Sequence, residues 1–158
     1  MEQVVIDSPI GKLGFVLRDG RLSRLDFLPA QASLVPPTGR RARLVVSRLR
    51  NYFKDPATSL QVDYAVRGTA YQLAVWAFLR TIPAGTILTY KQVSERVGGS
   101  PRSVGNACRA NPVPLLTPCH RVVSSRGIGG FSGQSSGPLL QIKHWLLAHE
   151  LGKKLEFA

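Results

Sequence analysis

The sequence predicts an α+β protein in which a small antiparallel sheet precedes a mainly helical half. Short apolar runs separated by turn residues fill the first third of the chain, whereas apolar positions at helical spacing dominate after Gly68. The chain has 158 residues, and 44% of them are hydrophobic, which is enough to bury a core. We therefore expect two domains, residues 1–67 and residues 68–158.

Three strands are expected in the first domain. Apolar runs at residues 4–6 and 13–16 flank a turn at residues 8–11. The Arg18-Asp19-Gly20 turn then leads to a third strand at residues 22–27.

Residues 39–54 predict an amphipathic helix. Its apolar positions recur at helical spacing: Ala42, Val45, Val46, Leu49, Tyr52 and Phe53. Five arginines lie on the same segment: Arg40, Arg41, Arg43, Arg48 and Arg50. Such a run usually forms a solvated face, and a contact with DNA or a neighbouring protein is the alternative.

Three helices are expected early in the second domain. The first covers residues 69–79, with these residues at least partly buried: Tyr71, Leu73, Val75, Trp76 and Leu79. Thr89 can cap a short helix that ends at Gly98-Gly99, and another starts near Pro101 and reaches Ala110. Two short helices around a glycine turn predict a helix-turn-helix, although such corners also occur in proteins that do not bind DNA.

The last third combines a buried segment, a loop and a helix. Residues 114–123 are apolar except around Pro118-Cys119-His120-Arg121, and a glycine-rich loop follows at residues 127–137. Residues 138–150 predict a final helix. Its inward-facing residues are expected to be Leu139, Ile142, Trp145, Leu146 and Leu147.

The net charge of +12 favours a polyanionic partner, although solubility alone is the alternative. Residues 1–66 carry 10 basic and 6 acidic residues, a net of +4, and residues 67–158 carry 11 and 3, a net of +8. No apolar run is long enough to span a membrane, and the first residues lack the long apolar stretch of a signal peptide. We expect a cytoplasmic, DNA-associated protein that does not bind membranes.

Two cysteines, Cys108 and Cys119, provide neither a disulfide framework nor the spacing of a zinc finger. Cys108 lies on the apolar side of its helix and is expected in the core. A cysteine in an apolar stretch, such as Cys119, is more often inert core than a nucleophile. On an extended chain the side chains of Cys119 and His120 point to opposite faces, so activation by His120 would need a bridging water or a local kink.

The string Asn111-Pro112-Val113-Pro114, followed by Pro118-Cys119-His120-Arg121-Val122, closely resembles the active-site signature of the O(6)-alkylguanine-DNA alkyltransferases. The resemblance covers nearly all of residues 68–152. Further matching motifs occur in the same order: Tyr71-Gln72, Val75-Trp76, Ile82-Pro83-Ala84-Gly85-Thr86, Thr89-Tyr90, Arg102-Ser103-Val104-Gly105, Gly130-Phe131-Ser132-Gly133 and Leu146-Leu147-Ala148-His149-Glu150.

The resemblance implies a ribonuclease-H-like sheet with a helix in the first domain, and a buried active-site cysteine beside the helix-turn-helix in the second. It implies direct-reversal DNA repair, in which 6-O-alkylguanine, chiefly 6-O-methylguanine, is flipped out of duplex DNA. Cys119 would then take the alkyl group irreversibly, so each protein molecule would be a suicide enzyme that acts once.

The same resemblance assigns roles at the expected catalytic site. His120 would take the thiol proton through a water, and Glu150 would orient and charge His120. Tyr90 would hydrogen-bond the base ring, and Asn111 would brace the recognition helix against the active-site strand. No cofactor and no metal are implied.

Substrate and DNA contacts are also implied. The carbonyls of Cys119 and Val122 would accept from the guanine amino group, the backbone N–H of Ser132 would face the departing oxygen, and Arg102 would fill the gap in the base stack. Two more residues are expected in the base pocket, Trp76 and Phe131. The remaining DNA contacts are expected at Tyr90, Ser103, Asn106, Arg109 and Ala110.

The sequence departs from the family pattern in four places, one of which is the Gly98-Gly99-Ser100-Pro101 turn, which is short. Phe131 stands where many members have tyrosine, the loop at residues 134–138 is long, and no cysteine precedes Cys108, which removes the N-terminal zinc site of some relatives. A non-catalytic alkyltransferase-like protein and a plain helix-turn-helix regulator are the alternatives, and Cys119 favours the enzyme. We expect a monomer, with cooperative binding to DNA left open.

Overall fold

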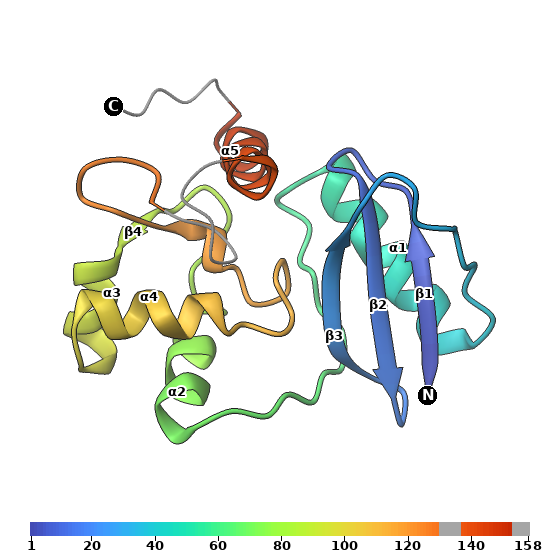
Figure 1. Cartoon of the computed structure of the whole chain (residues 1–158), viewed down its shortest axis with the longest axis horizontal. Coiled ribbons are helices and arrows are strands. Elements are labelled where there is room, and N and C mark those ends of the chain that lie inside the picture. The colour runs from blue at the N-terminus through green and yellow to red at the C-terminus, as the bar shows by residue number, and fades with distance from the viewer. Residues whose placement is uncertain (130–136, 153–158) are drawn as a thin grey trace. The chain divides into compact units, whose positions relative to one another are not determined.

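The structure is a computed structural model that describes residues 1–129 and 137–152. The chain divides into two compact units (Figure 1). Unit 1 contains Met1–Val66 and also Pro112–Leu116, and unit 2 contains Arg67–Asn111 and Thr117–Ala158. The α+β fold class expected from the sequence is confirmed.

Unit 1 is built on a three-stranded antiparallel sheet in the order β1-β2-β3. The strands are β1 (Glu2–Ile6), β2 (Lys12–Arg18) and β3 (Arg21–Leu28), close to the predicted ranges. Asp19 and Gly20 both have positive φ, which suits the two central residues of the tight turn between β2 and β3. Val4, Phe15 and Leu25 pair across the sheet and are all buried, so they form part of the core of this unit.

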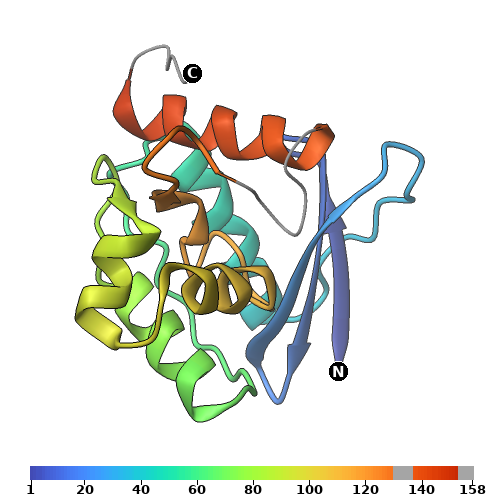
Figure 2. The same cartoon turned by 60° about the vertical axis from the view of Figure 1, so that its left-hand side comes forward.

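Helix α1 (Arg40–Lys54) lies against the sheet (Figures 1 and 2). Its buried residues are Ala42, Val45, Val46, Leu49 and Tyr52, while Phe53 is half-buried. The Glu2 carboxylate accepts from the backbone N–H groups of Thr38 (2.7 Å) and Gly39 (3.2 Å), which caps the helix from the first strand. Four of the five arginines are exposed and Arg48 is half-buried, in agreement with a solvated face.

Unit 2 is mainly helical, as predicted. Its helices are α2 (Ala70–Leu79), α3 (Tyr90–Val97), α4 (Pro101–Arg109) and α5 (Pro138–Leu151), and a single 3-10 turn, η1, covers Cys119–Arg121. A short parallel pair joins β4 (Leu88–Thr89) to β5 (Val122–Val123), which the sequence did not reveal. Figure 2 shows α3 and α4 side by side and α5 along its length.

Capping residues define where three of these helices begin. Thr69, Thr89 and Ser100 each form a capping box with the residue three positions later, and Pro101 occupies the first turn of α4. Gly98 and Gly99 form the turn between α3 and α4 with positive φ. A Cβ on Gly99 would lie 2.5 Å from Ser103 Oγ, so only glycine fits between the two helices of the predicted helix-turn-helix.

Three burial predictions need correction. Leu73 is 39% exposed because α2 turns this side chain away from the face that buries Val75, Trp76 and Leu79. Cys108 is half-buried rather than a core residue. On α5 the fully buried positions are Lys143, Leu146 and Leu147, whereas the three others predicted to face inward are only half-buried: Leu139, Ile142 and Trp145.

Within the described part of the chain, no helix is both long enough and apolar enough to cross a membrane. The same residues contain no group of three or more His, Cys, Asp or Glu side chains placed to hold a metal ion.

Candidate active site

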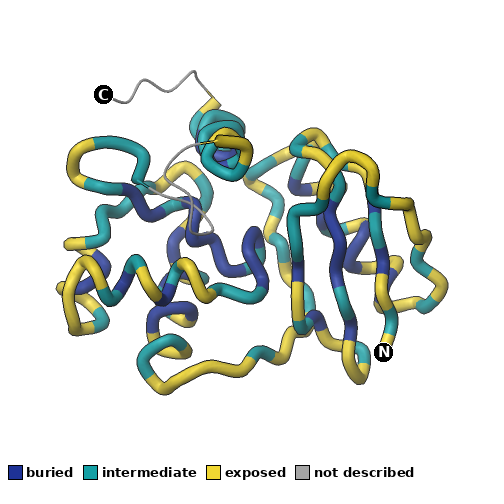
Figure 3. Tube along the Cα trace, in the orientation of Figure 1, coloured by how far each residue is buried: buried dark blue, intermediate teal, exposed yellow. Residues whose placement is uncertain are grey.

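The candidate site is built around the η1 turn. The N–H of Cys119 donates to the Thr117 carbonyl (2.8 Å), and the N–H of Arg121 donates to the Pro118 carbonyl (3.0 Å). The chain is therefore curled rather than extended at Cys119 and His120, so the local kink considered for the sequence is present here. Both side chains are buried, as is almost the whole segment that leads to η1 (Figure 3).

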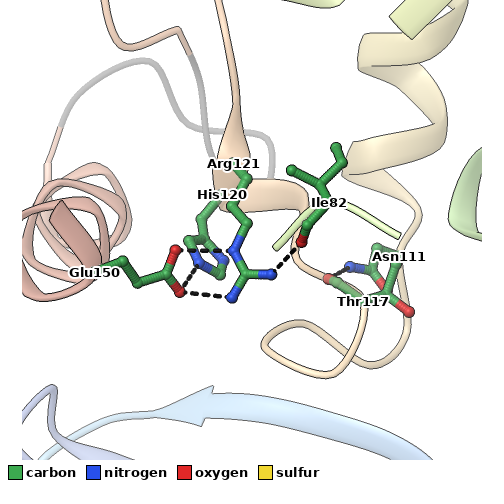
Figure 4. Close-up of polar contacts among 6 residues, drawn as sticks. All are labelled: Ile82, Asn111, Thr117, His120, Arg121 and Glu150. Carbon is green, nitrogen blue, oxygen red and sulfur yellow. Dashed lines mark hydrogen bonds and ion pairs between the residues drawn. The ribbon is translucent and has the colours of Figure 1, made fainter. Parts of the chain in front are cut away.

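His120 is held by Glu150 from the last turn of α5 (Figure 4). Nε2 of His120 lies 2.7 Å from Oε2 of Glu150, and each side chain is only 1% exposed. Burial acts to raise the pKa of Glu150, but hydrogen bonds from His120 and Arg121 outweigh it and hold this pKa well below its usual range. Because the carboxylate is ionised and accepts at Nε2, the proton of neutral His120 belongs on Nε2.

The other ring nitrogen of His120 is the acceptor in this arrangement. Nδ1 is buried and has no hydrogen-bond partner among the described residues. Burial lowers the pKa of His120, the hydrogen bond and charge of Glu150 oppose this effect, and the charges of Arg121 and Lys143 add to the lowering. His120 is therefore neutral at neutral pH and can accept a proton at Nδ1.

Cys119 rests as a thiol. Burial raises the pKa of Cys119, while a hydrogen bond with Asn111 and the charge of Lys143 act in the opposite direction. Only the thiolate is a strong nucleophile, so a base beside Cys119 is needed before it can react. The neighbouring imidazole is a candidate for that base, because its Nδ1 has no hydrogen-bond partner in the part of the chain that the structure describes.

Asn111 connects α4 to the segment before Cys119. It follows the end of α4, and its Nδ2 donates to the Thr117 carbonyl at 2.8 Å (Figure 4). The contact therefore agrees with the bracing role predicted for Asn111, and Asn111 also reaches the Cys119 thiol.

Lys143 is a site residue that the sequence analysis missed. Its side chain is fully buried, and Nζ donates to the Val122 carbonyl at 2.7 Å and to the Tyr90 hydroxyl at 3.5 Å. Burial lowers the pKa of Lys143 to about 8, with the two cysteines acting against this shift. A signal was present, because Lys143 lies four residues after Leu139 and three before Leu146, on the inward stripe of the helix.

Tyr90 is the first residue of α3 and is half-buried. Burial raises the pKa of Tyr90 well above its ordinary value, so the hydroxyl keeps its proton and can donate it in a hydrogen bond. Nζ of Lys143 also lies 5.7 Å from the centre of the Tyr90 ring. Tyr90, Lys143 and Val122 therefore form a connected polar group beside the thiol.

Helix α4 presents most of the predicted DNA contacts on one exposed face. Arg102, Asn106 and Arg109 are exposed, and their spacing of four and three residues keeps them on the same side of the helix. Ala110, the C-cap residue of α4, is exposed as well. Ser103 differs, because its hydroxyl accepts from the Ser100 N–H (2.9 Å) and bonds the Tyr71 hydroxyl (2.9 Å). The Ser103 side chain therefore serves the helix cap, and its contact with DNA stays a prediction.

The expected pocket residues have different outcomes. Trp76 is only 2% exposed, and its indole N–H donates to the Ala107 carbonyl at 2.8 Å, so Trp76 supports α4 from the core, and its place in the base pocket stays a prediction. Val122 is fully buried, and its carbonyl already accepts from Lys143; a carbonyl has a second lone pair for a substrate. Phe131, Ser132 and residues 134–136 of the long loop at residues 134–138 lie outside the described residues.

Comparisons with known proteins find relatives that are similar to this chain in sequence and in fold. Residues 70–152 match the family model described as 6-O-methylguanine DNA methyltransferase, DNA binding domain. A methylated-DNA–protein-cysteine methyltransferase from Metallosphaera sedula is 36% identical over 79% of this chain and 80% of its own length. The protein of that name from Mus musculus is 34% identical over 95% of this chain and 81% of its own length.

The structural comparison gives the same answer. The crystal structure of Mycobacterium tuberculosis OGT in complex with DNA has a TM-score of 0.81 and 31% sequence identity, covering 98% of this chain and 95% of that one. The resemblance that the sequence motifs carried is therefore confirmed. With a family model over more than half of the chain, relatives above 30% identity and a matching fold, this chain belongs to the methylated-DNA–protein-cysteine methyltransferase family.

Proposed function

We propose that this protein repairs 6-O-alkylguanine in duplex DNA by moving the alkyl group onto Cys119. The observation that carries the proposal is the arrangement of Cys119 and His120 on one buried turn, with Glu150 on one ring nitrogen of His120 and no partner on the other among the residues described. Family membership supports the same reaction, because the relatives are named for transfer of a methyl group from DNA to a protein cysteine.

The first step is a proton transfer. Nδ1 of neutral His120 accepts the Cys119 proton, directly or through one water, and the ionised Glu150 stabilises the imidazolium that forms. The thiolate then attacks the alkyl carbon, so that a carbon–sulfur bond forms while the bond from that carbon to the guanine oxygen breaks. The electrons of the broken bond stay on the guanine oxygen, the guanine anion takes up one proton, equivalent to the one that His120 accepted from Cys119, and the repaired guanine stays bonded to its strand.

Charge on the departing guanine needs a donor nearby. Tyr90 is suited to this role, because its raised pKa keeps the hydroxyl protonated beside the site. Lys143 fixes the Tyr90 hydroxyl and the Val122 carbonyl in place, and this carbonyl can accept from the guanine amino group. The contacts of the Tyr90 hydroxyl and the Val122 carbonyl with guanine can form only when the flipped base is inside the pocket.

DNA is the expected partner, and the target base must leave the helix to reach a buried thiol. Arg102, Asn106 and Arg109 on the exposed face of α4 are the residues proposed to contact DNA, and Arg102 would fill the space of the flipped base. The product is a thioether at Cys119, and water does not readily displace an alkyl group from a thioether. Each molecule therefore acts once.

Intact mass after incubation with methylguanine-containing duplex tests the proposal. Each protein molecule should gain one methylene unit, located on the peptide that contains Cys119. Cys119→Ser should bind the duplex normally and gain no mass, while Cys108→Ser, which alters the second thiol, should still gain it. Repeated turnover, or methylation on Cys108, would contradict the mechanism, and DNA binding with no mass gain would favour a non-catalytic relative.

A further inference from the structure

Arg121 joins three segments of unit 2 at the candidate site (Figure 4). Its Nε and Nη2 donate to the two carboxylate oxygens of Glu150 at 2.8 and 2.9 Å, and its Nη1 donates to the Ile82 carbonyl at 2.5 Å. The turn that carries the thiol is thus tied to α5 and to the loop that follows α2. The Arg121 side chain is only 12% exposed, so these contacts are shielded from water.

Glu150 accepts hydrogen bonds from both Arg121 and His120. Oε2 accepts from Nη2 of Arg121 and also from Nε2 of His120, at 2.9 and 2.7 Å. Because the planar guanidinium of Arg121 donates to both oxygens of Glu150, the carboxylate cannot rotate away from the imidazole of His120. Part of its negative charge is also balanced before His120 gains a proton.

We propose that Arg121 is a positioning residue that, through Glu150, fixes the proton of His120 on Nε2 and limits how strongly the imidazole holds a second proton. The inference rests on the proposed alkyl transfer and adds a residue to its machinery. Neither the composition nor the spacing of the sequence assigned Arg121 any role. The contacts that carry the inference are all made by side chains or carbonyls of unit 2.

The geometric part of the role follows from hydrogen bonding. With Glu150 locked as an acceptor, Nε2 must be the donor, and the Nδ1 lone pair stays free for the Cys119 proton. A lysine at this position would keep the positive charge, but a single ammonium could not grip both carboxylate oxygens and the Ile82 carbonyl in the same way.

The electrostatic part follows from charge balance. The charged groups that act on His120 are Glu150 and Lys143 from α5 and Arg121 from its own turn, with Cys119 as the neighbouring titratable group. A lone buried Glu150 would strongly favour an imidazolium and so occupy the base before the reaction begins. Arg121 opposes this, which leaves His120 neutral and ready to accept the proton of Cys119.

Two substitutions separate these parts. Arg121→Met removes the positive charge and the N–H donors but keeps an unbranched apolar side chain. Arg121→Lys keeps the positive charge but replaces the planar guanidinium with a single ammonium group. Protonation of His120 is followed by NMR of its ring nitrogens from about pH 5 to about pH 9, the range in which histidines titrate. Single-turnover transfer from methylguanine duplex is measured on the same samples.

In the Met variant, His120 should gain its proton at a pH higher by about one unit, a tenfold change in proton affinity, and the acid limb of the transfer rate should move with it. In the Lys variant, the titration should stay as in the wild type, while the rate at every pH falls by about tenfold. Arg80→Met is the matched control, because Arg80 donates to the Thr117 hydroxyl at 2.8 Å in the same region. It should leave the titration of His120 unchanged.

An unchanged His120 titration in the Met variant, with equal rate losses at all pH values, would overturn the proposal and leave Arg121 a purely structural residue. If the Met variant does not fold, Arg121→Gln takes its place, since it removes the charge and keeps one donor. In a Glu150→Gln background, the Arg121 substitution should no longer shift the titration. The NMR readout needs no activity, so a protein that transfers nothing would disprove the proposed function while still testing Arg121.

Discussion

Burial has opposite effects on the reactivity of the Cys119 thiol and on the protonation of His120. A buried thiol is protected from bulk water, but burial also raises the pKa of Cys119 and removes the thiolate that the reaction requires. Burial shifts the pKa of His120 the other way: it lowers this pKa and keeps the imidazole neutral. The two shifts together give a resting pair of thiol and neutral imidazole, and in the proposed mechanism the proton moves only as the reaction proceeds.

The sequence could predict part of this site and not the rest. Cys119, His120 and Glu150 were found because they fall in one ordered set of motifs, and the structure brings His120 and Glu150 together. Lys143 was missed, since a lysine on an apolar stripe is normally a surface residue whose stem is buried. Arg121 was missed because the contacts of its guanidinium depend on Glu150 and Ile82, which are 29 and 39 residues away.

At the residue scale, Lys143→Met should raise the free energy of unfolding near pH 7. Burial lowers the pKa of Lys143 from 10.5 to about 8, so between these two pH values the folded state releases a proton that the unfolded chain keeps, and below about pH 8 both states carry the charge. The cost of the buried charge, about 3 kcal/mol before lost hydrogen bonds are counted, is fully present below about pH 8 and disappears as the pH rises toward about 10.5. Denaturant unfolding at several pH values measures it.

The gain in stability of the Met variant should therefore be largest near neutral pH and shrink as the pH rises. Raised pKa values at Cys108, Cys119 and Tyr90 act in the opposite direction in the same pH range, but they occur in both proteins and largely cancel in the difference. Lys91→Met on the exposed side of α3 is the control and should change little. A gain that is constant with pH would show that Lys143 is not a buried titrating group.

At the scale of elements, local sequence signals were sufficient wherever a helix begins with a cap. Thr69, Thr89 and Ser100 start their helices within a residue or two of the predicted positions, because each cap satisfies backbone N–H groups of its own first turn. The β4–β5 pair could not be predicted, since its two-residue strands exist only through pairing over more than 30 residues. The η1 turn was hidden in an apolar segment that resembles a strand.

The helix-turn-helix gives the prediction at this scale. Arg102→Ala should slow repair of duplex by about tenfold or more, while reaction with a free alkylguanine base stays close to the wild-type rate, because only the duplex needs a nucleotide to be flipped out. Arg102 is exposed on the first turn of α4, so its removal leaves the buried site untouched. Single-turnover rates on the two substrates measure the difference.

Arg109→Ala is the matched control on the same helix. It removes the same charge from the same exposed face, and it should weaken binding of damaged and undamaged duplex alike without changing the rate at saturating protein. Equal rate losses on duplex and free base for Arg102→Ala would mean that Arg102 acts on the fold or the base pocket instead.

At the scale of the whole molecule, the charge of +12 is divided unequally along the chain. Residues 1–66 have a net charge of +4, but α1 alone carries five arginines and Lys54 with no acidic residue, so the rest of that stretch is net negative at −2 (4 basic and 6 acidic residues). Two basic faces therefore exist, one on α1 and one on α4. The sequence assigned the first to solvent and the second to DNA, with a DNA contact of α1 as the alternative.

Salt dependence of DNA binding distinguishes the two faces. Each phosphate contact releases counterions, so the affinity for unmodified duplex should fall linearly with salt on a logarithmic plot, with little sequence preference. Arg109→Ala should reduce the steepness of that plot by about one, whereas Arg50→Ala on the exposed face of α1 should leave it unchanged. Both variants lower the net charge by one, so a difference between them reports direct contact rather than general attraction. Equal reductions would place α1 on DNA as well, and no reduction in either would mean that these charges serve only solubility.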